Sequence, residues 1–125
     1  MGRPSFEKLR AYELSEQPAD RIWAIVVKWN FFGKDTVGKQ IVRSADSVGA
    51  NIAEGCGRWS YQDNRRFVRI ARGSLNETKN WLRRAFRRKL LIEEQVSFLK
   101  PLLDDLAPTL NAYLRSIGQD GSNDQ

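Results

Sequence analysis

The chain of 125 residues has no histidine and only one cysteine, Cys56. Without histidine, the commonest general base, the Ser-His triad and nearly all protein zinc sites are excluded. A single cysteine cannot form a disulfide within the chain, and a lone thiol is typical of proteins from a reducing compartment. These absences predict a cytoplasmic protein that needs neither a metal nor another cofactor.

Long apolar runs are absent too. The longest, IWAIVV at residues 22–27, is far too short to cross a bilayer. The segment MGRPSFEKLRAYELS lacks the apolar core of a signal peptide, and Phe6 stands where a myristoylation signal requires serine or threonine. We therefore expect no membrane partner. With 41% apolar residues, the chain can bury the core of one domain without covalent cross-links.

Helical periodicity fills most of the chain. Apolar residues recur at the spacing of one helix face through residues 5–31, where Pro18 predicts a kink. A second helix is expected at about 36–56, with Asp35 able to cap its start. Its inner face alternates small and branched side chains, and comprises Val37, Ile41, Ser44, Ala45, Val48, Ile52 and Gly55.

The third helix is expected to begin after Ser60, which with Asp63 resembles a capping box, and to continue to about Lys89. Its apolar stripe comprises Phe67, Ile70, Ala71, Ser74, Leu75, Thr78, Leu82 and Ala85. The fourth helix covers about 93–117, where apolar residues alternate steps of three and four. The apolar spacing of this helix continues through Pro101 and Pro108, so these prolines predict local bends and not helix ends.

No strand-like alternation competes with these patterns. The sequence therefore predicts an all-α fold, an antiparallel up-and-down four-helix bundle with kinked first and last helices. The bundle forms a single domain over residues 1–117, and the polar tail at 118–125 is expected to be disordered.

The stretch SVGANIAEGCGRWS, residues 47–60, joins the second and third helices. It lacks the Gly-Lys-Ser/Thr ending of a phosphate loop and does not follow a strand. Glu54 is the best carboxylate for catalysis, but a glutamate beside arginines is more often a structural ion pair. We interpret the small residues as a close packing site, because Gly49 and Gly73 would each cost a helix about 1 kcal/mol. Asn51, Glu54 and Arg58 are expected to form a polar network.

Two blocks, QIVRSADSVGANIAEGCGRWS and RRFVRIARGSLNET, resemble the four-helix bundle proteins encoded in intervening sequences of 23S ribosomal RNA, formerly called ribosomal proteins. That family is related to the accessory protein of diversity-generating retroelements. The resemblance implies a homopentamer without catalytic activity that binds nucleic acid and a reverse transcriptase. Gly49 departs from the family, which often has proline there. The matching positions are Arg43, Asn51, Glu54, Gly55, Arg58, Arg72, Gly73 and Ser74.

Basic charge is concentrated in one segment. The segment from Arg58 to Lys89 contains eleven arginines and lysines and only two acidic residues, a net charge of +9. The whole chain carries only +6, because the remaining residues are net acidic. One sector of the third helix, opposite the predicted apolar stripe, contains only cations, and we call it the cationic ridge: Arg65, Arg69, Arg72, Lys79, Arg83 and Arg87. Arg66, Arg84 and Arg88 flank it. A solvated face normally mixes both signs, so this sector favours a polyanion partner.

Aromatic residues suggest two further roles. Trp59, Tyr61 and Trp81 lie near the basic segment and could stack on bases, although Trp81 is better placed for packing. Trp23, Val27 and Phe31 form an apolar line beside the inner face of the first helix, more than one bundle can bury, which suggests an oligomer interface.

The sequence thus favours a non-enzymatic, oligomeric bundle that binds RNA or DNA through phosphates. The alternative is an interaction scaffold whose cationic face docks an acidic or nucleic-acid-bound protein, such as a reverse transcriptase. An enzyme that uses carboxylates comes third.

Overall fold

Four long helices make up the computed structural model, which describes residues 5–119. They are α1 (Arg10–Val26), α3 (Lys39–Cys56), α4 (Tyr61–Arg87) and α5 (Glu93–Ser116). A 3-10 turn at Phe6–Lys8 precedes α1, and the short helix α2 (Phe31–Gly33) and a π-helical segment (Lys34–Gly38) lead into α3. Residues 117–119 form a turn after α5, and the rest of the predicted disordered tail lies outside the described residues.

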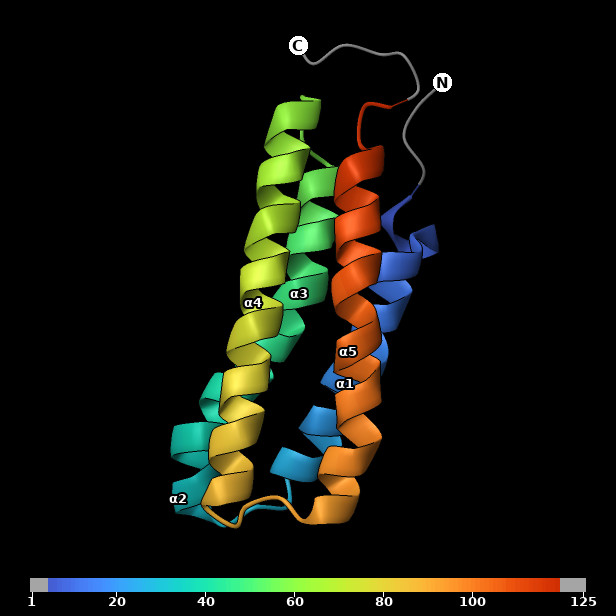
Figure 1. Ribbon diagram of the computed structural model, residues 1–125. Helices are drawn as coiled ribbons and strands as arrows, with labels where there is room; N and C mark the ends of the chain where they lie inside the picture. Colours follow the sequence, from blue (N-terminus) through green and yellow to red (C-terminus); the bar gives the residue numbers. More distant parts are fainter. Residues whose placement is uncertain (1–4, 120–125) are drawn as a thin grey trace.

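The four long helices run alternately down and up the bundle (Figure 1). α1 and α4 each pack against both α3 and α5, so the helices form a four-membered ring around one core. The α3–α4 turn lies at the same end as the start of α1, whereas α2 and the α4–α5 connection lie at the other end (Figure 1). The predicted antiparallel four-helix bundle is confirmed.

Prolines interrupt neither of the helices that contain them. Pro18 lies inside α1, and Pro101 and Pro108 lie inside α5. Each removes one backbone donor, but the apolar faces of both helices stay buried, and this burial outweighs the lost hydrogen bonds. α1 is nevertheless shorter at both ends than the predicted 5–31. It begins at Arg10, after the 3-10 turn, and it ends at Val26, where a turn follows.

The second helical stretch begins earlier than predicted. Asn30 caps it, since its side-chain Oδ1 accepts a hydrogen bond from Gly33 N at 2.8 Å. Asp35, the expected cap, lies inside the helical segment and pairs with Lys39 at 3.0 Å. The correction follows from the backbone of Asn30, which is extended and leaves its side chain free to accept from the first turn.

The inner face of α3 is buried as predicted. It comprises Val37, from the preceding π-helical segment, with Ile41, Ser44, Ala45, Val48, Ile52 and Gly55. α3 packs most extensively against α4. Inside this contact Thr78 Oγ1 lies 3.0 Å from Ser44 Oγ and 2.8 Å from the Ser74 carbonyl, so the buried hydroxyls satisfy one another.

The glycines of the bundle differ in what surrounds them. A Cβ at Gly55 would lie 2.5 Å from Asn64 Oδ1 and 3.0 Å from Phe67 Cβ, so Gly55 permits the close approach of α3 and α4. Gly49 is also enclosed, but by Ser15 of α1 and not by α4. Gly73 was predicted to lie in this packing site, and that prediction is wrong: it is exposed, with nothing within 4 Å of its would-be Cβ among the described residues.

The buried stripe of α4 differs from the predicted one. Ala71, Leu75, Thr78, Leu82 and Ala85 are buried as expected, together with Asn64 and Val68, which the predicted stripe omitted. Ile70, in contrast, is 41% exposed. At 100° per residue these changes rotate the core face by roughly 35°, toward the side that carries the cationic ridge. The ridge therefore borders the contact with α5 and does not lie opposite the core.

Alanine substitutions at two glycines test this packing. Gly55→Ala should lower the free energy of unfolding by about 1–3 kcal/mol, because the added methyl group overlaps Asn64 and Phe67. Gly73→Ala is the matched control and should raise it by up to about 1 kcal/mol, since the site is open and alanine favours helix. Urea unfolding followed by circular dichroism measures both. Equal effects of the two substitutions would contradict close packing at Gly55.

Candidate nucleic-acid interface

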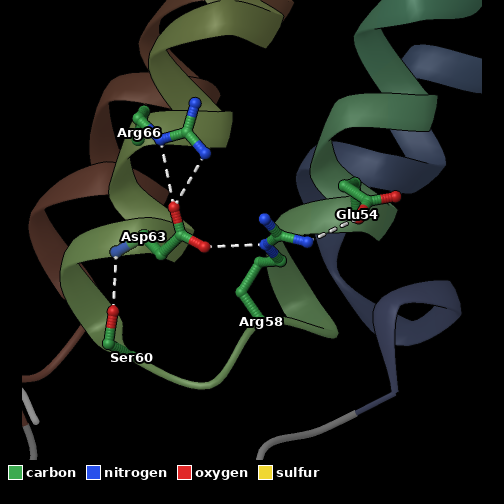
Figure 2. Close-up of polar contacts among 5 residues, drawn as sticks. All are labelled: Glu54, Arg58, Ser60, Asp63 and Arg66. Carbon is green, nitrogen blue, oxygen red and sulfur yellow. Dashed lines mark hydrogen bonds and ion pairs between the residues drawn. The ribbon is translucent and has the colours of Figure 1, made fainter.

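The turn between α3 and α4 is fixed by a cap and by one arginine. Ser60 Oγ accepts a hydrogen bond from Asp63 N at 3.0 Å, which confirms the predicted start of α4. Arg58 Nε donates to Asp63 Oδ2 at 2.7 Å, and Arg58 Nη1 donates to Glu54 Oε2 at 3.2 Å. Arg58 thus links the end of α3 to the first turn of α4 (Figure 2).

Asp63 is the centre of this network, which we call the turn network: Glu54, Arg58, Ser60, Asp63 and Arg66. Arg66 donates to Asp63 Oδ1 from the other side at 2.9 and 3.0 Å (Figure 2). Hydrogen bonds from Arg58 and then Arg66 hold the pKa of Asp63 below its ordinary value of 3.8. Both guanidinium groups also lie over the Phe67 ring, at 4.9 and 4.7 Å from its centroid.

The other motif residues do not join this network. Asn51 was expected there, but its side chain donates to the Ser47 carbonyl at 2.8 Å, within α3. Arg43 donates to Gln40 Oε1, also within α3. The pairing of Arg58 with Asp63 was not predicted, although an arginine five residues before an acidic residue at the start of a helix is a signal that could have suggested it.

Half of the cationic ridge makes polar contacts with α5 or with Ile117, the residue that follows it. Arg65 Nη1 donates to the Ile117 carbonyl at 3.0 Å, and Arg72 Nη1 donates to Asn111 Oδ1 at 2.9 Å. Lys79 Nζ lies 3.4 Å from Asp104 Oδ1. The rotation of the buried stripe explains these contacts, because it turns this side of α4 toward α5.

The other three ridge residues, Arg69, Arg83 and Arg87, are exposed. Within residues 5–119 none of them has an acidic partner. The last turns of α4 and the residues that follow form a cluster that we call the basic end: Arg83, Arg84, Arg87, Arg88 and Lys89. The helix dipole favours cations near a helix C-terminus, but only by about 1 kcal/mol at most for each exposed cation.

Aromatic residues lie near both ends of α4. Trp59, beside the turn network, is 87% exposed, whereas Tyr61 and Trp81 are partly buried and pack on the core. At the other end, Phe31 and Phe32 of α2 are 76% and 77% exposed. α2 is close to the basic end, since a Cβ at its Gly33 would lie 3.0 Å from Leu90.

An acidic groove lies on another side of the bundle, between α1 and α3. It has a volume of about 310 Å³, and Glu16, Asp20 and Asp46 line it together with small residues and the aromatic Phe6 and Tyr12. Burial, followed by repulsion from Asp20, raises the pKa of Asp46. A polyanion would be repelled from this groove, so the α4 side is the candidate interface for nucleic acid.

Residues 5–119 contain neither a cluster of side chains suited to a metal ion nor a helix suited to a membrane. No cluster of three His, Cys, Asp or Glu side chains is arranged to hold a metal ion in this part of the chain. None of its helices is both long and apolar enough to cross a membrane.

The lowered pKa of Asp63 predicts a dependence of stability on pH. Ionised Asp63 stabilises the folded state above pH 3.8, and this stabilisation is lost as the pH falls through the lower pKa of the folded protein. Asp63→Asn should therefore melt at a lower temperature than the wild type at pH 7 and lose less further stability on acidification. Asp105→Asn, at an exposed position, is the control. A wild-type pH profile for Asp63→Asn would contradict a stabilising turn network.

Comparison with known proteins agrees with this architecture. No curated protein matches the chain. Among solved structures, the chain is similar to a crystal structure of a protein of unknown function from the S23 ribosomal protein family of Bacteroides thetaiotaomicron VPI-5482. The two share 27% sequence identity with a TM-score of 0.73, over 83% of this chain and 97% of the other. Residues 7–112 match the family described as 23S rRNA-intervening sequence protein, and the chain belongs to that family.

Proposed function

We propose that this protein is a non-enzymatic bundle that binds nucleic acid through the exposed cations of α4. The observation that carries the proposal is the basic end, in which five cations lie within seven residues and none has an acidic partner in the described part of the chain. Arg69 extends the same side toward the turn network. Phosphate oxygens are the ligands that such a cluster of guanidinium groups binds best.

The geometry supports binding through charge and not through base recognition. Arg69 and Arg87 are 18 residues apart on α4, about 27 Å at 1.5 Å per residue, which is long enough to meet several phosphates. The exposed arginines of α4 project from the convex surface of one helix, a geometry that does not by itself fix them against base edges. We expect weak sequence preference and a steep decrease in affinity with salt.

One observation favours the alternative scaffold function. Phe31 and Phe32 place exposed apolar surface beside the basic end, a combination that suits an acidic protein partner as well as a nucleic acid. The resemblance to retroelement accessory proteins implies a reverse transcriptase as one such partner. Capture of a partner protein without salt-dependent binding of nucleic acid would favour the scaffold.

We further propose that the chain assembles as a homopentamer, the state that the family resemblance implies. Its support is the apolar line on one side of the bundle, because Trp23, Val27 and Phe31 are 58%, 47% and 76% exposed. Surface of this kind is usually covered in a soluble assembly. A ring of subunits would also bring several basic ends to one polyanion and increase avidity.

The nucleic-acid proposal predicts the effect of a triple substitution. Replacing Arg69, Arg83 and Arg87 by glutamine should weaken binding of random duplex by about tenfold or more at low salt. It should also reduce the slope of log affinity against log salt concentration by about two to three, since each neutralised phosphate contributes about 0.9. Filter binding across a salt series measures both quantities.

The matched control removes the same charge elsewhere. Arg10, Lys28 and Arg115 are exposed cations outside α4, and replacing all three by glutamine should change the slope less than the α4 triple does. Equal effects of the two triples would mean that net charge alone governs binding. An unchanged slope in a correctly folded α4 triple would rule out the proposed interface.

The assembly proposal predicts the mass in solution. Light scattering at micromolar concentration should give about five times the 14.4 kDa of one chain. Trp23→Gln combined with Val27→Gln should lower this mass while the helical content stays, because both side chains are exposed in the single bundle. Ile92→Gln, at an exposed position outside the apolar line, is the control. A wild-type mass near 14.4 kDa would exclude the homopentamer.

A further inference from the structure

A shallow groove of about 430 Å³ lies beside the first two turns of α4, at the end of the helix opposite the basic end. Trp59, Ser60, Gln62, Asp63, Arg66 and Arg69 line it. We propose that this groove binds an unpaired nucleotide of a single-stranded nucleic acid, with its base stacked on Trp59 and its phosphate on Arg69. The inference rests on the proposed nucleic-acid function and names the form of nucleic acid that this site recognises.

The Trp59 indole offers a stacking surface on a fixed backbone. The side chain is 87% exposed, although an indole is among the side chains that gain most from burial. Its two neighbours are both held by Asp63: Arg58 through its guanidinium at 2.7 Å, and Ser60 through the helix cap at 3.0 Å. The turn therefore presents the indole without a large further loss of backbone entropy on binding.

The polar side of the groove suits a phosphate and a base edge. Arg69 is exposed and has no acidic partner among residues 5–119, so its guanidinium is available to a phosphate. Among the described residues, Asp63 is the one carboxylate that lines the groove, and Arg58 and Arg66 already pair with it. Gln62 is exposed on the groove wall and carries both a donor and an acceptor for a base edge.

An unpaired base fits this combination better than a duplex does. In a duplex the faces of the bases are stacked on one another, so an exposed indole gains nothing from them. In a single strand every base has a free face, and stacking on aromatic side chains combined with cationic contacts to the backbone is the usual mode of binding. The basic end, in contrast, contacts phosphates in either form.

The experiment compares a single strand with a duplex. Fluorescence anisotropy measures the affinity of the assembled protein for a labelled single-stranded RNA of mixed sequence, about 20 nucleotides long, and for a blunt duplex of the same length. Trp59→Ala should weaken binding of the single strand about tenfold and change duplex binding less than about twofold. Trp59→Phe should retain most of the affinity, since its ring can still stack.

Two controls separate this inference from the proposed function. Phe98→Ala removes another exposed aromatic side chain, on α5, and should leave both affinities unchanged. The α4 triple at Arg69, Arg83 and Arg87 should weaken binding of both forms. Trp59→Ala should keep the wild-type melting temperature and mass.

Each remaining outcome overturns a defined statement. If the wild type binds both forms and Trp59→Ala weakens neither, or weakens both equally, the groove is not a site for unpaired nucleotides and the proposed function stands. If Trp59→Ala lowers the mass of the assembly, Trp59 is a subunit contact and the inference is wrong. If the wild type binds neither form, the proposed function itself is wrong.

Discussion

The close contact of α3 with α4 at Gly55 is the constraint on which the rest of the bundle depends. With a hydrogen in place of a side chain, α4 approaches until Asn64 and Phe67 touch the α3 backbone. The connection between the two helices is short, so the position of α4 at this point fixes where it starts. Arg58 then secures the start by bridging Glu54 and Asp63 across the turn. Packing sets the distance between the helices, and the ion pairs set the geometry of the turn.

The rotation of α4 follows from this contact and decides which cations remain exposed. With Asn64 against Gly55, Val68 and Leu75 face the core one and three turns further along the helix. The flank that carries Arg65, Arg72 and Lys79 then meets α5 and provides its polar contacts. A single geometric condition thus divides the residues of the cationic ridge into those that make polar contacts with α5 or the residue after it and those that make none with the described residues.

Most of the fold could be predicted from the sequence because periodicity reports burial reliably when polar and apolar faces are distinct. The inner face of α3 is such a case, because every residue predicted for it is buried. Gly49, which packs against α1, is buried as well and was left out of the predicted face. α4 was harder, because Ile70 is apolar but exposed and Asn64 is polar but buried. Each is an exception to the rule that apolar side chains are buried and polar side chains exposed, and together they displaced the predicted apolar stripe of α4. The contacts of Arg72 with Asn111 and of Arg58 with Asp63 depend on that rotation and on the turn, so periodicity alone could not supply them.

The two ends of α4 differ in how their charge is balanced, and this difference bears on function. At the N-terminal end Asp63 offsets part of the charge of Arg58 and Arg66, and a carboxylate there is also favoured by the helix dipole. At the C-terminal end the dipole stabilises a cation by about 1 kcal/mol at most on an exposed surface. Repulsion among the five cations of the basic end opposes that gain, and no acidic side chain of the described residues offsets it. The requirements of the fold therefore do not account for the whole cluster, whereas an anionic partner would relieve its repulsion on binding.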